Sequence, residues 1–215
     1  MSSLEDKLRE AIEEAKKESK KRNFKQSVEL IINLRDVDLK KPENRINEKV
    51  ILPNKIGKEI GVCVFGDGDF ASKAKEAGAK AVISREALEK LASDKKEIKK
   101  LAENYDVFIA RADYMPLIGR HLGPILGPRN KMPEPIPPTG DIASAISKAQ
   151  NTVWIRTRNQ PLIQCIIGTE DMPTEKLLEN ALTVISKIRE KFKSLRNIES
   201  IYIKTTMGKP VKVTV

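Results

Sequence analysis

The sequence predicts an α/β protein in which one domain is inserted into another. In the middle of the chain, short apolar runs alternate with helix-like stretches, which is typical of a doubly wound α/β unit. The two ends instead combine strands with amphipathic helices, and neither end alone supplies a helix-covered sheet of three or more strands. We therefore expect a discontinuous α+β domain from residues 1–60 plus 153–215, interrupted by an α/β domain at residues 61–152. The 215 residues suffice for two cores.

The N-terminal part predicts a helix followed by two strands. Apolar residues recur at helical spacing over residues 4–20, with charges between them, as on an amphipathic helix. Residues 24–34 contain the alternation of a strand. A second strand is expected over residues 47–52, before the breakers Pro53 and Gly57.

The middle of the chain predicts three strands alternating with three helices. Residues 61–65 form a continuous apolar run, as strands buried on both faces do. We expect the other two strands at residues 80–83 and 106–110, and the helices at residues 70–77, 85–104 and 141–149.

A segment rich in proline and glycine, residues 115–138, follows the third of these strands. It holds seven of the twelve prolines and three of the eleven glycines. Proline fixes φ and lacks an N–H group, so a long helix or a central strand is excluded. The segment is too apolar for a disordered linker. We expect an ordered, extended loop docked on a domain, with Arg120, Arg129 and Lys131 projecting from it.

The C-terminal part returns to the first pattern. Residues 152–158 and 162–167 are expected to form antiparallel strands on either side of residues 159–161. Residues 172–192 carry the clearest apolar stripe of the chain and predict a helix. A last strand is expected over residues 200–206.

The charge of the chain indicates a polyanionic partner. The net charge is +10. Residues 1–60 plus 153–215 hold 26 basic and 18 acidic side chains, whereas residues 61–152 hold 14 and 12. If this surplus marks the surface that meets nucleic acid, the terminal domain carries that surface. An anionic membrane surface and plain solubility are the alternative explanations.

Several classes of protein are excluded. No apolar run approaches the roughly 20 residues that span a bilayer, and the N-terminus has no apolar signal segment. Cys63 and Cys165 lie in apolar strand-like runs, where we expect small buried side chains without a disulfide. One histidine and no Cys-x-x-Cys leave no zinc site. We expect a cytoplasmic protein with no metal and no membrane partner.

A nucleotide site and a catalytic site are both poorly supported. Gly66-Asp-Gly-Asp69 follows a strand, but Ala71 replaces the third glycine of the dinucleotide pattern, and the two aspartates would repel a phosphate. A strand-to-helix turn with Asp69 near the N-cap explains the residues better. His121 has no serine or cysteine nucleophile beside it, so we expect a packed or solvent-facing histidine. We expect no cofactor and no enzyme activity.

The terminal domain holds the better binding candidates. Thr205 and Thr206 can offer hydroxyls to a ribose 2′-OH, Met207 offers an adaptable apolar surface, and Gly208 lets an RNA backbone approach closely. A plain strand end and turn is the alternative. The candidates for phosphate contacts are Arg45, Arg156, Arg158 and Lys204. Because aromatic residues make up only 4% of the chain, we expect a structured RNA read by shape, 2′-OH and phosphate contacts.

The proline- and glycine-rich segment also carries a family resemblance. From Leu117 to Pro133 it reads Leu-Ile-Gly-Arg-His-Leu-Gly-Pro-Ile-Leu-Gly-Pro-Arg-Asn-Lys-Met-Pro. This closely resembles the signature of the large ribosomal subunit protein L-one (uL1) family, of archaeal or eukaryotic type. The matching residues are Leu117, Gly119, Arg120, Gly123, Gly127, Pro128, Arg129, Lys131, Met132 and Pro133. The resemblance implies a split β-α-β (ferredoxin-like) domain interrupted by a Rossmann-like three-layer α/β domain.

The resemblance also implies the rest of a binding site. Residues 205–208 resemble the Thr-Met-Gly motif with which this family contacts RNA, although Gly-Lys-Pro follows here where many bacterial relatives have Gly-Pro. Phe24-x-x-Ser27-x-Glu29 resembles the family's Phe-x-x-[Thr/Ser]-x-Glu segment. Ser27 and Glu29 would share one face of a strand, where Glu29 would accept hydrogen bonds from a 2′-OH or a guanine edge. Phe24 either contacts the RNA or anchors the core.

The function that the resemblance implies is structural. The protein would bind the stalk helices of large-subunit rRNA (23S-type) as a monomer when free and form the mobile L1 stalk, which assists release of exit-site tRNA. It would also bind its own mRNA leader and repress translation. Its location would be cytoplasmic and ribosome-associated. A Rossmann-type nucleotide-dependent enzyme with an accessory domain is the alternative, which detectable binding of NAD or ATP would favour.

Overall fold

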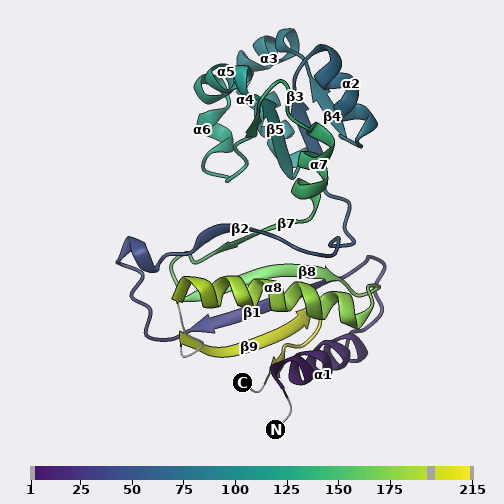
Figure 1. The fold of residues 1–215 in the computed structure, drawn as a ribbon, viewed down its shortest axis with the longest axis vertical. Coiled ribbons are helices and arrows are strands. Elements are labelled where there is room, and N and C mark those ends of the chain that lie inside the picture. The colour runs from purple at the N-terminus through teal and green to yellow at the C-terminus, as the bar shows by residue number, and fades with distance from the viewer. Residues whose placement is uncertain (1–2, 193–196, 214–215) are drawn as a thin grey trace. The chain divides into compact units, whose positions relative to one another are not determined.

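The chain folds into two compact units. The computed structural model describes residues 3–192 and 197–213. Unit 1 consists of residues 1–58 with 151–215, and unit 2 of residues 59–150. The architecture is mixed α/β, with antiparallel strands in unit 1 and a parallel sheet in unit 2, as Figure 1 shows, and it confirms the predicted fold class.

Unit 1 is built on an antiparallel sheet that joins both ends of the chain. Its strands are ordered β10-β9-β1-β8. Helices α1 and α8 lie on one face of this sheet (Figure 1). These elements have the following bounds: α1 Leu4–Lys17, β1 Ser27–Leu34, β8 Leu162–Thr169, α8 Thr174–Phe192, β9 Ile198–Thr205 and β10 Val211–Val213. The helix and strand over residues 4–34 are therefore shorter than predicted, beginning or ending within three residues of the expected bounds.

Burial alternates along β1 and explains why one face of the sheet stays open. Val28, Leu30 and Ile32 are fully buried, and their neighbours in the strand are half-buried. Because successive side chains point to opposite faces, the buried set faces the helices. The apolar stripe of α8 covers this set, with buried residues Leu177, Leu178, Ala181, Val184, Ile185 and Ile188.

A two-stranded ribbon completes unit 1. β2 (Asn47–Ile51) pairs with β7 (Thr152–Arg156), after the short 3-10 helix η1 (Pro42–Asn44). The expectation that residues 152–158 and 162–167 pair with each other is wrong, because β8 pairs with β1 instead. Asn180 of α8 anchors the end of the ribbon: its amide accepts from the Asn54 N–H at 3.0 Å and donates to the Ile167 carbonyl at 2.7 Å.

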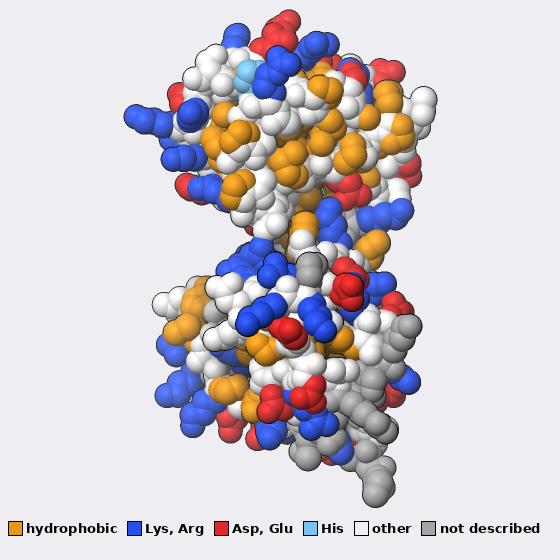
Figure 2. Space-filling view, turned by 90° about the vertical axis from the view of Figure 1, so that its left-hand side faces the viewer, with side chains coloured by type: hydrophobic (Ala, Val, Ile, Leu, Met, Phe, Trp, Pro, Cys, Tyr) orange, Lys and Arg blue, Asp and Glu red, His pale blue; other side chains and the backbone are white. Residues whose placement is uncertain are grey.

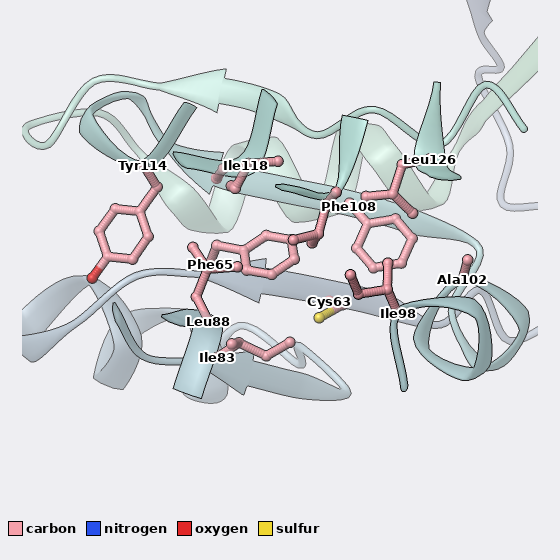
Figure 3. Close-up of a cluster of buried hydrophobic side chains, with 12 residues drawn as sticks. Cys63, Phe65, Ile83, Leu88, Ile98, Ala102, Phe108, Tyr114, Ile118 and Leu126 are labelled. Carbon is pink, nitrogen blue, oxygen red and sulfur yellow. The ribbon is translucent and has the colours of Figure 1, made fainter. Parts of the chain in front are cut away.

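Unit 2 contains a parallel sheet covered on both faces. Its strands β3 (Val62–Phe65), β4 (Ala81–Ile83), β5 (Val107–Arg111) and β6 (Glu134–Ile136) are ordered β4-β3-β5-β6. Val62 and Val64 pack with α2 (Gly68–Glu76) and α7 (Ile142–Gln150). Cys63 and Phe65 pack on the other side, where Figure 3 shows Phe65 and Phe108 at the centre of a second cluster. Two-sided burial accounts for the continuous apolar run of β3.

The proline- and glycine-rich segment is not the extended loop that we expected. It begins, after the 3-10 helix η2 (Ala112–Tyr114), with two short helices, α5 (Met115–His121) and α6 (Gly123–Leu126). A proline stands in the first turn of each helix, where its missing N–H group is not needed. Ile118, Leu122 and Leu126 are then buried on one side of the sheet. The strand β6 contains Pro135 and lies at the sheet edge, where proline is tolerated.

The single helix predicted over residues 85–104 is also a pair of helices. α3 (Arg85–Ala92) ends before α4 (Lys95–Asn104) begins. Asp94 is the N-cap of α4, and its carboxylate accepts from the backbone N–H of Lys96 at 2.7 Å. A capping aspartate satisfies N–H groups that a continuous helix would bond internally, so it favours a new start. Within residues 3–192 and 197–213, none of the helices is both long and apolar enough to cross a membrane.

Candidate nucleic-acid interface

The turn at residues 205–208 is fastened to the start of β1. The hydroxyl Oγ1 of Thr206 accepts from the Ser27 N–H at 3.0 Å and lies 3.3 Å from the Ser27 carbonyl, to which it donates. The Thr206 N–H donates to the same carbonyl at 3.0 Å. A hydroxyl has two acceptor lone pairs, so Thr206 keeps one for a further donor such as a 2′-OH. The structure thus brings Ser27 and Thr206, 179 residues apart, into direct contact.

Thr205 plays a different part from the one we expected. Its side chain is fully buried, and its hydroxyl lies 3.2 Å from that of Ser19. It therefore faces the interior and not the surface on which the prediction placed it. A Cβ atom added to Gly208 would lie 2.2 Å from the Thr205 Oγ1, so the buried hydroxyl leaves room only for glycine here.

Gln26 is a buried residue that supports the turn, and the sequence analysis did not predict this role. The side chain is 1% exposed. Its Oε1 accepts from the Met207 N–H at 3.1 Å, while its Nε2 donates to the Lys20 carbonyl at 3.0 Å and the Ser19 hydroxyl at 2.7 Å. The carboxylate of Glu170 accepts from the Gln26 backbone N–H at 3.0 Å. A buried, fully bonded amide fixes the groups around it, so Gln26 positions the turn. Only its place beside Ser27 could have drawn attention to it.

The open face of the sheet carries Ser27, Glu29 and Lys204 side by side. Glu29 lies opposite Lys204 in the pairing of β1 with β9, and both are half-buried. The Glu29 carboxylate accepts from the Gln164 amide at 2.7 Å, while the Lys204 ammonium donates to the Thr206 carbonyl at 3.3 Å. Glu29 thus retains acceptor capacity that faces outward, because a carboxylate has about four acceptor positions.

Two apolar side chains border this group. Phe24 precedes β1 and is 50% exposed, so the core-anchoring alternative is wrong. Met207, at the tip of the turn, is 60% exposed. Exposed large apolar residues beside polar groups provide contact area for a partner. Figure 2 views unit 1 from the side away from this turn, where Lys and Arg side chains are mixed with Asp and Glu and with hydrophobic patches.

The three arginine candidates form a second group on the ribbon. Arg156 pairs with Asn47, and the ladder continues because the Thr157 N–H donates to the Ile46 carbonyl at 3.0 Å. Arg45 and Arg158 flank this last pair and are exposed. Val153 and Ile155 are buried on the opposite face of β7 from Arg156.

Two cationic side chains of the signature segment (residues 117–133) contact helix α4 of unit 2. Lys131 was expected to project, but its ammonium donates to the carbonyls of Ala102 and Tyr105 at 2.8 and 2.7 Å. These carbonyls lie at the C-terminal end of α4, where a cation is favoured. Arg129 forms an ion pair with Glu103 at 3.6 Å, whereas Arg120 is exposed.

The remaining signature residues continue this structural pattern. Leu117 packs against the Figure 3 cluster, and Pro133 is buried just before β6. Met132 is 40% exposed. Gly119 and Gly123 lie in α5 and α6, and Gly127 and Pro128 follow α6. The segment therefore positions helices of unit 2.

The turn after β3 offers no phosphate cradle. Asp67 is the N-cap residue of α2, and Asp69 lies in the first turn, near the N-cap as expected. The Asp67 carboxylate accepts from the Tyr114 hydroxyl and from the Arg85 N–H at 3.3 Å. Burial, then the bond to Asp67, raises the pKa of Tyr114 to about 12, so the hydroxyl stays protonated as the donor. An aspartate in the turn repels a phosphate, as argued from the sequence.

The two cysteines and the histidine, the other residues that could react or bind a metal, are partly or fully buried. Burial raises the pKa of Cys63 and of Cys165 to about 12, which keeps both as thiols. Both cysteines are free and buried. His121 ends α5 and is half-buried. Among the described residues, no group of three or more His, Cys, Asp or Glu side chains could hold a metal ion.

Comparison with known proteins gives one family over most of the chain. Residues 15–209 match the model of the Ribosomal protein L1p/L10e family. The chain is similar to the large ribosomal subunit protein uL1 of Thermofilum pendens, with 53% identity covering 99% of this chain and 93% of that protein. It is also similar to the proteins of the same name from Archaeoglobus fulgidus (49% identity; 97% and 98% covered) and Methanothermobacter thermautotrophicus (46% identity; 98% and 100% covered).

Proposed function

The chain belongs to the Ribosomal protein L1p/L10e family, in its archaeal form, and from this premise we propose that unit 1 grips a folded segment of large-subunit rRNA. Family membership makes the chain a protein of the large ribosomal subunit that associates with its rRNA. It also implies a structural, non-enzymatic role. The surface of unit 1 that meets the RNA is the part that we propose.

The observation that carries this proposal is the join between the Thr206 turn and the open face of β1. Two chain segments from opposite ends of the sequence present a hydroxyl, a carboxylate and an ammonium on one surface. Hydrogen bonds to Ser27 and Gln26 hold the turn, so little conformational entropy remains to be lost on binding. Thr206 and Glu29 are suited to 2′-OH groups, which distinguish RNA from DNA.

Glu29 fits this surface in spite of its charge. A carboxylate near a polyanion costs Coulomb energy, but it accepts strong hydrogen bonds from a 2′-OH or a guanine edge. Lys204, opposite it in the sheet, compensates part of the repulsion. Glu29 would therefore contribute the choice of RNA geometry, and Lys204, Arg45, Arg156 and Arg158 the phosphate attraction.

The wider role follows from the family resemblance. We propose that the bound protein forms the mobile stalk of the subunit, that unit 2 lies nearer the leaving exit-site tRNA, and that the same surface of unit 1 binds the protein's own mRNA leader. The net charge of the chain, +10, supports nucleic-acid partners in each case. The protein would act in the cytoplasm and be monomeric when free.

Chemical footprinting of rRNA on large subunits with and without the protein tests the proposal. We expect one structured rRNA segment to be protected by the wild-type protein. Lys204→Gln should weaken protection and lower the salt dependence of binding. Lys99→Gln removes the same charge from an exposed position of unit 2 and is the matched control. Equal effects of the two substitutions would contradict the assignment of the surface to unit 1.

A further inference from the structure

Unit 1 contains an open pocket of about 480 Å³ that none of the residues assigned to RNA above lines. Its walls come from the loop after β2, from the turn between β8 and α8, and from the segment before β1. The lining includes Lys25, Lys55, Gly57, Thr169, Asp171 and Lys176. A pocket of this size has room for a phosphate together with the group that carries it.

The hydroxyl of Thr169 is a buried polar group on the wall of this pocket. Thr169 is 2% exposed, and no residue that the structure describes forms a hydrogen bond with its Oγ1. A Cβ atom added to Gly57, which lines the same pocket, would lie 2.5 Å from this Oγ1, so a glycine at position 57 leaves the hydroxyl uncovered. Burying a hydroxyl without a hydrogen bond costs free energy. Thr169 therefore offers a donor to a group that enters the pocket.

The charge of the lining favours an anion. Three lysines line the pocket, against one carboxylate, that of Asp171. This carboxylate forms an ion pair with the Lys25 ammonium at 2.8 Å. Lys55 and Lys176 are exposed and add two further positive charges. The pocket thus combines a positive surplus with a buried hydroxyl, which suits a group that carries negative charge on oxygen atoms.

The start of α8 adds to this positive potential. The helix begins at Thr174, between lining residues of the pocket. The N–H groups in the first turn of a helix have no partner within the helix and attract anions. Glu175 and Glu179 of α8 do not line the pocket. Glu175 pairs with Arg9 at 2.9 Å, and the Glu179 carboxylate accepts from the Asn54 amide at 2.6 Å.

Hydrogen bonds hold both walls of the pocket in place. In the turn after β8, the Met172 carbonyl accepts from the Lys16 ammonium at 2.7 Å, and the Met172 N–H donates to the Thr169 carbonyl at 3.0 Å. In the loop after β2, the Asn180 amide accepts from the Asn54 N–H at 3.0 Å and donates to the Asn54 carbonyl at 3.2 Å. A ligand therefore meets a wall that needs little ordering when it binds.

We propose that this pocket binds a phosphate group. The Thr169 hydroxyl donates to one phosphate oxygen, while Lys55, Lys176 and the start of α8 compensate the negative charge. The inference goes beyond the proposed function, because it requires neither RNA nor the Thr206 turn. A free phosphate ester and a phosphate of RNA present the same chemistry to the pocket, and separate measurements distinguish them.

Titration of the intact protein with inorganic phosphate at constant ionic strength, followed by amide NMR, tests the site without RNA. We expect the amide signals of Gly57, Thr169 and Lys176 to shift to a saturable limit. Thr169→Val keeps the shape of the side chain and removes the hydroxyl. It should raise the dissociation constant about tenfold, the order of one hydrogen bond to a charged group, whereas Thr169→Ser should retain most of the affinity. Urea unfolding checks that the valine variant is folded.

A matched pair of lysine variants controls for general charge effects. Lys176→Gln should weaken phosphate binding, whereas Lys99→Gln, the same change at an exposed position of unit 2, should not. Shifts that do not saturate, equal effects of the two lysine variants, or an unchanged dissociation constant for Thr169→Val would each overturn the phosphate site. These results would leave the proposed function intact, because the titration contains no RNA.

Binding of a folded rRNA fragment identifies the source of the phosphate once the titration has shown the site. If the group belongs to RNA, Thr169→Val should weaken binding of the fragment. If the ligand is a free phosphate ester, the variant should bind the fragment as tightly as the wild type does. Failure of the wild-type protein to bind the fragment would instead contradict the proposed function.

Discussion

The sheet of unit 2 is buried on both faces, whereas the four-stranded sheet of unit 1 has one face open. In unit 2, β3 buries Val62 and Val64 on one side and Cys63 and Phe65 on the other, so both faces belong to the core. In unit 1, β1 buries alternate residues and turns Glu29 outward with its neighbours. A sheet with one face open can present side chains to a partner from a rigid backbone. A sheet covered on both faces leaves that task to its ends and loops.

The polar groups of the two units differ in the same sense. The Lys131 ammonium of unit 2 donates hydrogen bonds to two carbonyls at the C-terminal end of α4. Thr206 of unit 1 is also bonded internally, yet its half-buried hydroxyl keeps one acceptor lone pair that these bonds do not use. The capacity to bind a partner therefore depends on the hydrogen-bond donors and acceptors that a polar group does not use within the protein. A count of basic residues does not measure this capacity.

Phe108→Ala should have the largest effect and act on unit 2 alone. The ring is 1% exposed and stacks on Phe65 at 6.0 Å. Its removal should lower the free energy of unfolding of unit 2 by about 3–5 kcal/mol. Far-UV circular dichroism follows both units during urea unfolding, whereas Trp154 fluorescence follows unit 1. Met132→Ala, at an exposed position of the same unit, should change stability by about 0.5 kcal/mol or less.

Affinity for RNA provides the second half of that test. Under conditions where the Phe108→Ala protein is folded, its dissociation constant for an rRNA fragment should stay within about twofold of the wild-type value, because Phe108 belongs to the core of unit 2 and the proposed RNA surface belongs to unit 1. A parallel loss of affinity would break the contrast drawn between the units.

Gln26→Leu should have the next largest effect and act on unit 1. The substitution leaves the Met207 N–H and the Lys20 carbonyl without their partner. Both bonds are only partly buried, so water can replace part of each, and we expect a loss on the order of 1–3 kcal/mol in the free energy of unfolding. RNA binding should weaken as well, as measured by filter binding. Unaltered affinity in a destabilised protein would show that the turn needs no support from Gln26.

Thr206→Val should weaken RNA binding by about 1–3 kcal/mol, because a partner group is left unpaired at the interface. Thr206→Ser keeps the hydroxyl and should retain most of the affinity. Titration of an rRNA fragment, with urea unfolding of each variant alongside, separates the loss of binding from the loss of the Ser27 bonds. An unchanged dissociation constant for the valine variant would remove Thr206 from the interface.

Arg158→Ala should have the smallest effect, visible mainly in the salt dependence. If the exposed guanidinium meets one phosphate, the slope of log K against log salt should fall by somewhat less than about 1. Lys99→Ala, at an exposed position of unit 2, is the control, with no change expected. A slope identical to that of the wild type would show that Arg158 makes no phosphate contact.

The success of the sequence prediction differs between the fold and the site. Periodicity located most helices and strands to within a few residues, because α1, α8 and β1 each bury one regular stripe. It failed at residues 115–138, where proline was taken as a sign of a loop although it also starts short helices. It failed again at Asp94, which caps a new helix inside one continuous charge pattern.

For the site, residue types were informative and side-chain directions were not. Ser27, Thr206 and Met207 were chosen for their chemistry. Thr205 has the same chemistry as Thr206, yet its hydroxyl faces the core. Whether a threonine at a strand end points inward depends on the register with the neighbouring strand, and register is set by pairing across 179 residues of sequence.

By itself, the sequence determined the mixed α/β class, the family and the cationic character of the chain. Apolar periodicity, motifs and charge are local properties that can be recognised from residues close together in the sequence. Only the tertiary structure decided that β8 pairs with β1 and not with β7, that Gln26 supports the turn, and that Lys131 is turned inward. These features depend on which distant segments meet, and long-range contacts are fixed by the packing of the whole unit.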